Sequence, residues 1–141
     1  MKYLCCLCLP ALLMLSACST TKTADKTSGS GDPETVMVTY HVKPGSEAEM
    51  QKVLAQAWDT YRHENLVFKY PHVIVRDQED GSKPRIVEIF TWVSHSAPEH
   101  APDSVKALWG QMQALCEERN GHGGLTGGEV ELLVPKGHAG E

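Results

Sequence analysis

Cysteine, basic charge and long apolar runs are all scarce in this sequence of 141 residues. Only Cys116 lies beyond residue 18, so that part of the chain cannot form an intrachain disulfide. The formal net charge of −5 argues against a nucleic-acid partner, which would require a basic surface. The apolar run near the N-terminus, Tyr3–Leu15, is shorter than the roughly 20 residues of a membrane-spanning helix.

The first seventeen residues have the pattern of a targeting segment. Lys2 supplies a positive charge, an apolar stretch follows, and small residues precede Cys18. The four residues Leu-Ser-Ala-Cys that end at Cys18 resemble the lipobox of bacterial lipoproteins. The resemblance implies that residues 1–17 form a signal peptide and that Cys18 becomes the lipidated N-terminus. The alternative is an ordinary secretion signal with an incidental cysteine.

The resemblance also implies a location in the cell envelope. The residue after the cysteine is Ser19, whereas an aspartate at this position would retain the protein in the inner membrane. Serine therefore favours the outer membrane, with the protein facing the periplasm. Residues 18–34 are expected to form the lipidated cysteine and a flexible tether, because they include no large apolar residue. Removal of the signal peptide would also remove Lys2 and lower the net charge from −5 to about −6. Because this negative charge argues against electrostatic binding to the membrane, the lipid on Cys18 would be the only membrane anchor.

Residues 35–135 are expected to form one small domain, with a tail at 136–141. Alternation and helical periodicity predict two helices among four strands. The predicted strands are 35–42, 66–76, 85–93 and 129–134. The first helix would follow a capping box of Ser46 and Glu49, and the second would run from Asp103 as N-cap to Gly121. The order βαββαβ predicts a ferredoxin-like α+β fold.

The third predicted strand, 85–93, is apolar on both faces and is expected to be central and covered on both sides. Pro71 lies within the second strand, which places that strand at an edge or at a bulge. A sheet of this plan has helices on one face only. Apolar groups on its other face predict a homodimer.

From Tyr40 to Val134 the chain resembles the dimeric α+β barrel superfamily, specifically its antibiotic-biosynthesis-monooxygenase-like group. The resemblance rests on the segment before the first helix (40–46), on the strand that ends in Trp-x-Ser (86–94), on His100 and on the helical segment 105–109. It implies a homodimer whose sheets close into a barrel, with a pocket between sheet and helices. Some members oxidise polycyclic phenols without metal or flavin, others bind and degrade haem, and many have no assigned activity.

The haem-degrading branch has an asparagine in the first strand and a histidine ligand on a helix. Here residues 36–41 read Val-Met-Val-Thr-Tyr-His, and both His95 and His100 precede the second helix, so haem binding is the less favoured alternative. His95, Glu99 and His100 match no zinc-binding pattern. We therefore expect no metal and no other cofactor.

Glu88 lies on the predicted central strand, where a carboxylate must find a partner or shift its pKa. His72 on the neighbouring strand and His100 on the following turn are candidate partners. A glutamate–histidine pair in a cleft can take a proton from a phenol or an enol. The alternative is a structural pair, or a glutamate at the open edge of the sheet.

Trp92 and Trp109, with Phe90 and Tyr40, are candidates for the wall of a site that stacks a flat ligand. The alternative is ordinary core packing, the usual place of aromatic side chains at such spacings. Two functions stay open at this point. One is a dimeric module that binds a small ligand, such as an aromatic molecule. The other is a cofactor-free monooxygenase that acts on an aromatic or phenolic small molecule.

Overall fold

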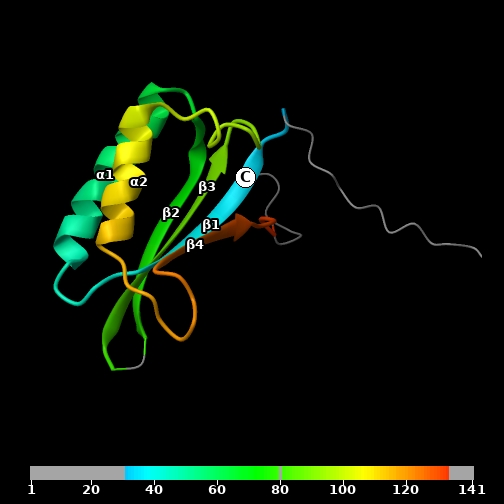
Figure 1. The fold of residues 1–141 in the computed structure, drawn as a ribbon. Helices are drawn as coiled ribbons and strands as arrows, with labels where there is room; N and C mark the ends of the chain where they lie inside the picture. The colour runs from blue at the N-terminus through cyan, green and yellow to red at the C-terminus, as the bar shows by residue number, and fades with distance from the viewer. Residues whose placement is uncertain (1–30, 80, 134–141) are drawn as a thin grey trace, which may run out of the picture.

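The computed structural model describes residues 31–79 and 81–133. Its elements are β1 (Glu34–His41), α1 (Glu47–His63), β2 (Val67–Glu79), β3 (Lys83–Trp92), α2 (Asp103–Ala114) and β4 (Leu125–Glu129). The four strands form one antiparallel sheet in the order β2-β3-β1-β4, and both helices lie along the same face of it (Figure 1). The predicted ferredoxin-like βαββαβ fold is confirmed. The predicted signal peptide, Cys18, nearly all of the tether and the tail lie outside the described residues.

The core lies between the helices and the sheet. Alternate residues of β3, from Ile86 through Glu88 and Phe90 to Trp92, point toward the helices and are buried. The register with β1 places Val38 opposite Glu88, and both belong to this face. The apolar face of α1 packs on the sheet because its buried residues recur at helical spacing. These are Met50, Val53, Leu54, Ala57 and Tyr61.

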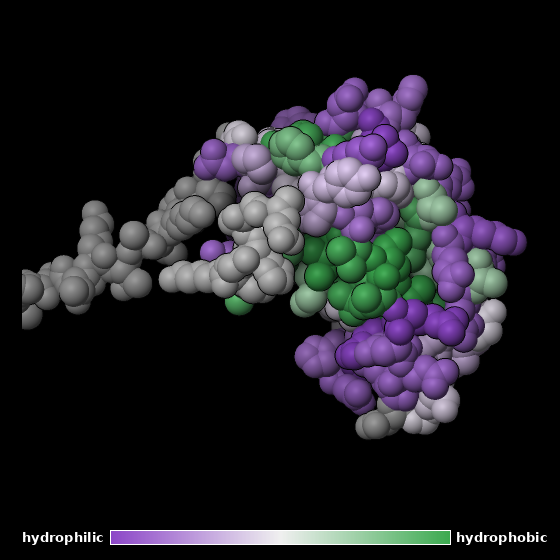
Figure 2. Space-filling model, turned by 180° about the vertical axis from the view of Figure 1, so that it is seen from behind, coloured by the Kyte–Doolittle hydropathy of each residue, from purple (hydrophilic) through white to green (hydrophobic). Residues whose placement is uncertain are grey.

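The opposite face of the sheet carries apolar side chains that no described element covers. Val73 and Val75 of β2 lie opposite Ile89 and Val87 of β3, and Ile89 also lies opposite Met37 of β1. Val75 is 53% exposed, and Val73 and Met37 are also exposed. Figure 2 shows, from behind, a contiguous hydrophobic patch bordered by hydrophilic residues. Within residues 31–79 and 81–133, β3 is therefore covered on one side, not on both as predicted.

The edge strand β2 is irregular at Pro71. The peptide bond between Tyr70 and Pro71 is cis, and the register with β3 shifts between Val67 and His72. Both outcomes predicted for a proline in this strand, an edge position and a bulge, are confirmed. After the shift, His72 lies opposite Phe90, on the helix side of the sheet.

The predicted capping of α1 and both predicted ends of α2 differ from the structure. Ser46 is the N-cap of α1, as predicted, but its side chain makes no capping hydrogen bond, so the capping-box prediction was wrong. Pro102, not Asp103, is the N-cap of α2. α2 ends at Ala114, well before Gly121, because the chain then pairs with the end of β1. Glu117 N donates to His41 O at 2.9 Å, so its amide bonds across to β1 and does not continue the helix.

The last strand, β4, is formed by a glycine-containing segment that precedes the predicted strand. It spans Leu125–Glu129, not 129–134, and pairs with β1. Gly124 just before it passes so close to the preceding loop that a Cβ would lie 2.9 Å from the Cβ of Cys116. A side chain at Gly124 would therefore push β4 away from this loop.

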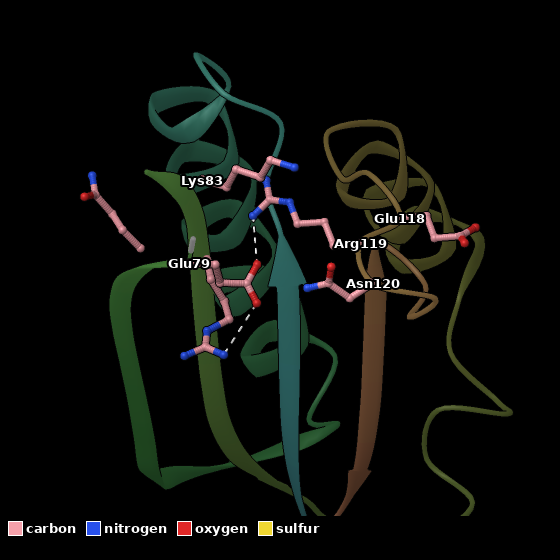
Figure 3. A pocket seen from close by; sticks show the side chains of 7 residues that line it. Glu79, Lys83, Glu118, Arg119 and Asn120 are labelled. Carbon is pink, nitrogen blue, oxygen red and sulfur yellow. Dashed lines mark hydrogen bonds and ion pairs between the residues drawn. The ribbon is translucent and has the colours of Figure 1, made fainter. Parts of the chain in front are cut away.

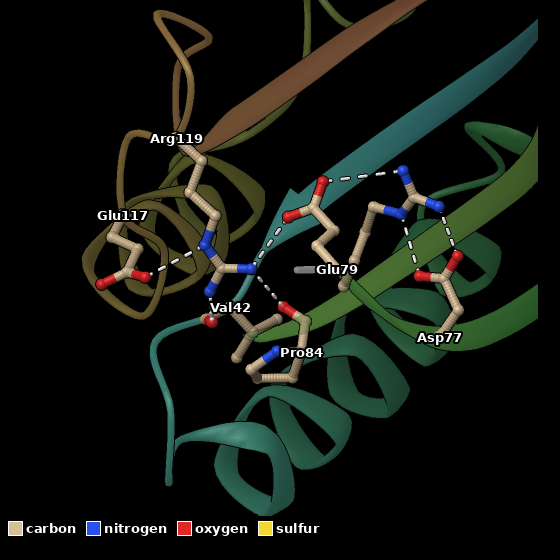
Figure 4. A network of polar contacts seen from close by, with 7 residues as sticks. Val42, Asp77, Glu79, Pro84, Glu117 and Arg119 are labelled. Carbon is tan, nitrogen blue, oxygen red and sulfur yellow. Dashed lines mark hydrogen bonds and ion pairs between the residues drawn. The ribbon is translucent and has the colours of Figure 1, made fainter. Parts of the chain in front are cut away.

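Arg119 ties this loop to the rest of the domain. Its side chain is 3% exposed, and it donates from Nε to Glu117 Oε1 at 3.0 Å and from Nη1 to Glu79 Oε2 at 3.0 Å. Its remaining bonds go to the backbone oxygens of Pro84 and Val42 (Figure 4). One guanidinium thus joins β1, the β2–β3 hairpin and the segment after α2.

Candidate functional site

An apolar cavity of about 260 Å³ lies between the sheet and α2. It is slightly smaller than the roughly 300–1,000 Å³ of pockets for drug-sized molecules, so it suits a small ligand. Its lining combines five aromatic side chains with four others. They are Tyr40, Tyr61, Phe90, Trp92 and Trp109, with Val38, Met112, Gln113 and Leu125. All four residues proposed from the sequence as a ligand wall line this one cavity.

The aromatic walls hold one another in place. The Trp92 ring meets Phe90 and Trp109 edge to face, with centroids 4.9 Å and 6.3 Å away. Trp109 Nε1 donates to the Tyr61 hydroxyl at 2.6 Å, which links α2 to α1. Such perpendicular contacts are favourable and leave ring faces for further packing. The cavity therefore has flat, preformed sides.

Tyr61 lines the cavity but was not among the residues proposed from the sequence for the ligand wall. It lies on the apolar face of α1, and burial raises the pKa of its hydroxyl above the ordinary range. The hydroxyl is therefore neutral and accepts the indole proton of Trp109. The signal that could have marked it was the polar tip of a tyrosine on an otherwise apolar helix face.

Glu88 is buried, 2% exposed, and has two hydrogen-bond partners. Its Oε2 accepts from the Tyr40 hydroxyl at 2.8 Å, and its Oε1 lies 2.9 Å from His72 Nε2. We predicted from the sequence that this carboxylate has a partner and named His72 as a candidate. The structure brings Glu88 and His72 together. The bond from Tyr40 was not foreseen, because it depends on how β1 and β3 are aligned.

Tyr40 connects Glu88 to the cavity, since it lines the cavity and donates to the carboxylate. Burial and the negative charge of Glu88 both raise the pKa of the Tyr40 hydroxyl far above its usual value. Tyr40 therefore keeps its proton, which is directed at Glu88. Its oxygen lone pairs are left to accept a hydrogen bond from a ligand.

His72 connects Glu88 to the outside. Its side chain is 18% exposed, and its ring stacks on Trp58 with centroids 3.5 Å apart and planes 12° from parallel. Both residues line a surface hollow of about 340 Å³ between α1 and β2. A continuous polar chain, Tyr40–Glu88–His72, thus runs from the inner cavity to the outer surface.

His100, the third residue proposed for proton transfer, is placed elsewhere. It is exposed in the segment before α2, where its Nδ1 donates to Ser96 O at 2.9 Å. No contact among the described residues joins it to Glu88 or to the cavity. His95 pairs with Glu34 at 3.1 Å, and within 31–79 and 81–133 no group of three metal-ligating side chains occurs.

A larger hollow, about 470 Å³, lies at the β2–β3 hairpin and is polar. Figure 3 shows Glu79 and Arg119 facing each other across it, whereas the Glu118 carboxylate points away. Arg119 directs its donors at acceptors of the protein itself, and its hydrogen bond holds the pKa of Glu79 below the usual range. The charges of Glu79, Arg85 and Arg119 are paired with one another, so the aromatic cavity is the better candidate for a ligand site.

Two further chemically active residues are buried away from the cavity lining. Cys116 lies beyond α2 and is a free thiol whose pKa is raised by burial to about 11. His41, at the end of β1, is 7% exposed. Neither helix of the described chain is long and apolar enough to cross a membrane.

No protein-family model and no curated protein matches the chain. Solved structures do match its fold. SnoaB, a cofactor-independent oxygenase from Streptomyces nogalater, aligns with a TM-score of 0.53 at 20% identity, covering 74% of this chain and 99% of its own. An antibiotic biosynthesis monooxygenase aligns at 0.53 and 17% identity, covering 71% and 98%. A dimeric ferredoxin-like protein of unknown function from a Jannaschia species aligns at 0.52 and 18% identity, covering 71% and 99%.

Proposed function

We propose that this protein binds a small, flat, aromatic molecule in the cavity between the sheet and α2. The observation that carries the proposal is the lining itself, in which five aromatic side chains enclose about 260 Å³. Ligand sites combine apolar walls with a few fixed polar groups. Here the fixed polar group is the Tyr40 hydroxyl, which Glu88 orients from behind.

The two phenylalanines of the chain allow a matched test. Phe90 is buried and lines the cavity, whereas Phe68 is 43% exposed on β2. Binding of 2-naphthol is measured by calorimetry on the wild type, Phe90→Leu and Phe68→Leu. We expect Phe90→Leu to weaken binding about tenfold, which corresponds to 1.4 kcal/mol, and Phe68→Leu to leave it unchanged. Absence of binding to the wild type, or equal losses in both variants, would refute the proposal.

A second candidate, proton abstraction from a bound phenol, is favoured by the Tyr40–Glu88–His72 chain. A phenol in the cavity would donate to the Tyr40 oxygen while Tyr40 passes its own proton to Glu88. The ligand becomes a phenolate, and the proton stays with Glu88 and His72, which are 2.9 Å apart. A phenolate with further electron-donating groups can transfer an electron to dioxygen without a cofactor, so the step is restricted to electron-rich phenols. SnoaB, which shares the fold, is described as a cofactor-independent oxygenase.

The test of proton abstraction is the ionisation of a bound phenol. Absorbance of 4-nitrophenol is titrated with pH in the presence of wild type, Glu88→Gln and Glu64→Gln, the last being an exposed glutamate at the end of α1. Wild type and Glu64→Gln should lower the pH at which the bound phenol ionises, and Glu88→Gln should not. An unchanged ionisation in Glu88→Gln would remove Glu88 from the mechanism. Oxygen uptake with phenols then separates an oxygenase from a binding module.

The assembly we propose is a homodimer formed through the open face of the sheet. The patch that carries Met37, Val73 and Val75 is exposed in one copy, and a second copy with the same patch is self-complementary to it. The similar Jannaschia protein is described as dimeric. Two such sheets packed face to face would make the barrel that the resemblance implies.

The location we propose is the cell envelope, with the chain anchored through a lipid on Cys18 and facing the periplasm from the outer membrane. Cys18→Ser should shift the protein from the membrane fraction to the soluble fraction. Cys8→Ser, which changes a cysteine inside the signal, should leave it in the membrane fraction. Retention of the Cys18→Ser protein in membranes would contradict lipidation. Ser19→Asp tests the choice of membrane, since it should retain the protein in the inner one.

A further inference from the structure

A shallow groove of about 350 Å³ continues from the aromatic cavity on the same side of the sheet. It shares two residues, Val38 and Trp92, with the cavity. The two spaces therefore adjoin each other at those side chains. The groove then passes along β1 and β4 to the segment that precedes α2.

The strand β1 forms a common floor for cavity and groove. Alternate residues of a strand face the same side, so Glu34, Val36, Val38 and Tyr40 all point toward the helices. The cavity reaches Tyr40 and the groove reaches Glu34, six residues away, which is about 20 Å along a strand. The combined space is long enough for a ligand that extends well beyond one aromatic ring system.

Gly127 lies where cavity and groove meet. It pairs with Val38 across the β1–β4 ladder and lines the groove. A Cβ at Gly127 would make only an ordinary contact, 3.7 Å from Val38 Cγ2, and the backbone is not left-handed there. Unlike Gly124, this position does not need glycine for the chain to fold. What its missing side chain provides is open space on the helix side of β4.

The outer rim of the groove limits the charge of a ligand. It includes the carboxylates of Glu34, Glu99 and Glu129, and one histidine, His95, which pairs with Glu34. A ligand with a carboxylate or phosphate at its outer end would meet like charges there. The ligands that fit have an outer end that is neutral or positively charged.

We propose that Gly127 forms the mouth of the ligand site and sets the length of the molecule that it accepts, as a specificity-determining residue. The inference rests on the proposed binding of an aromatic ligand in the cavity. A short ligand lies wholly inside the cavity, beside Tyr40. A longer neutral one extends past Val38 and over Gly127 into the groove.

The test uses two neutral fluorescent probes, 2-naphthol as the short one and N-phenyl-1-naphthylamine as the long one. Gly127→Leu is compared with Thr126→Leu, because Thr126 pairs with Thr39, so it belongs to the other face of the same strand and does not line the groove. We expect Gly127→Leu to weaken binding of the long probe about tenfold, to keep the Kd of 2-naphthol and to slow its association. Thr126→Leu should bind both probes as the wild type does. Circular dichroism checks the fold, and Gly127→Ala repeats the comparison with a smaller loss if the leucine variant does not fold.

The outcomes separate this inference from the proposed function. If the wild type binds both probes and the substituted Gly127 proteins bind the long one equally well, Gly127 is not the mouth but the cavity is still the site. The same holds if Thr126→Leu loses as much affinity as Gly127→Leu. If the wild type binds neither probe, both the inference and the proposed function are overturned.

Discussion

His72 Nε2 lies 2.9 Å from Glu88 Oε1, which joins the edge strand β2 to a carboxylate buried in the middle of the sheet. The contact exists because pairing with β3 resumes at His72, directly after the irregularity at Pro71. A buried charge is costly unless hydrogen bonds offset the lost hydration. Glu88 obtains these from His72 and Tyr40. The same bonds can serve stability and proton transfer, and the ionisation experiment distinguishes the two uses.

Removal of the Tyr40 hydroxyl should destabilise the domain more than removal of the Tyr61 hydroxyl. Tyr40→Phe leaves Glu88 Oε2 buried without its donor, at a cost of about 1–3 kcal/mol. Tyr61→Phe removes a neutral acceptor from Trp109 and should cost about 1 kcal/mol. Urea unfolding of both variants measures the difference. Equal losses would show that the Glu88 carboxylate does not depend on Tyr40.

Arg119→Gln should lower the free energy of unfolding by about 3 kcal/mol, because removing one member of a buried ion pair leaves its partners unsatisfied. The affected groups are Glu79, Glu117 and the backbone oxygens of Val42 and Pro84. Arg62→Gln, at an exposed position near the end of α1, is the control and should change stability little. If Arg119→Gln lowers the free energy of unfolding no more than the control does, the hydrogen bonds of Arg119 do not stabilise the fold.

Acid should destabilise the fold through Glu79. The hydrogen bond from Arg119 lowers the pKa of Glu79 below its ordinary value of 4.5. A carboxyl group whose pKa is lower in the folded chain than in the unfolded chain stabilises the folded state at pH values above the unfolded pKa. This stabilisation is lost as the pH falls through the pKa of the folded chain. The free energy of unfolding should therefore decrease below about pH 4.5. Glu79→Gln should flatten this decrease, whereas Glu118→Gln, at an exposed carboxylate, should leave it intact.

A charge on the open sheet face should dissociate the proposed homodimer. Val75 is 53% exposed and lies opposite Val87 on that face, whereas Arg76 lies opposite Ile86 and belongs to the other face. Val75→Asp should therefore shift the protein to monomer in sedimentation experiments, and Arg76→Asp should not. A wild-type monomer, or a Val75→Asp dimer of unchanged stability, would contradict the proposed interface.

Cys116 should react slowly in the folded protein. Burial raises its pKa from 9.0 to about 11, so at pH 8 its thiolate fraction is about a hundredfold lower than in the unfolded chain. Its contribution to stability is fully present below pH 9 and is lost as pH rises through about 11. Alkylation followed by mass mapping of the peptide that contains Cys116 measures the rate with and without urea. Equal rates would show that the thiol is accessible in the fold.

The local pattern of the sequence determined the element order, the central position of β3 and which of its residues share a face. Alternation in a strand and the 3.6-residue period of a helix depend on neighbouring residues alone. For the same reason Glu88, Phe90 and Trp92 were placed on one face correctly. Pro71 on an edge strand followed from its missing amide proton.

Only the tertiary structure decided which of these residues meet. The bond from Tyr40 to Glu88 depends on the register of β1 with β3, and His72 reaches Glu88 only after the shift at Pro71. Neither register can be read from local periodicity, because it is set by hydrogen bonds between residues far apart in the chain. His100 looked equally suitable by sequence and lies elsewhere. The glycines of β4 have little strand propensity, so their pairing with β1, and the open space at Gly127, became visible only in the folded sheet.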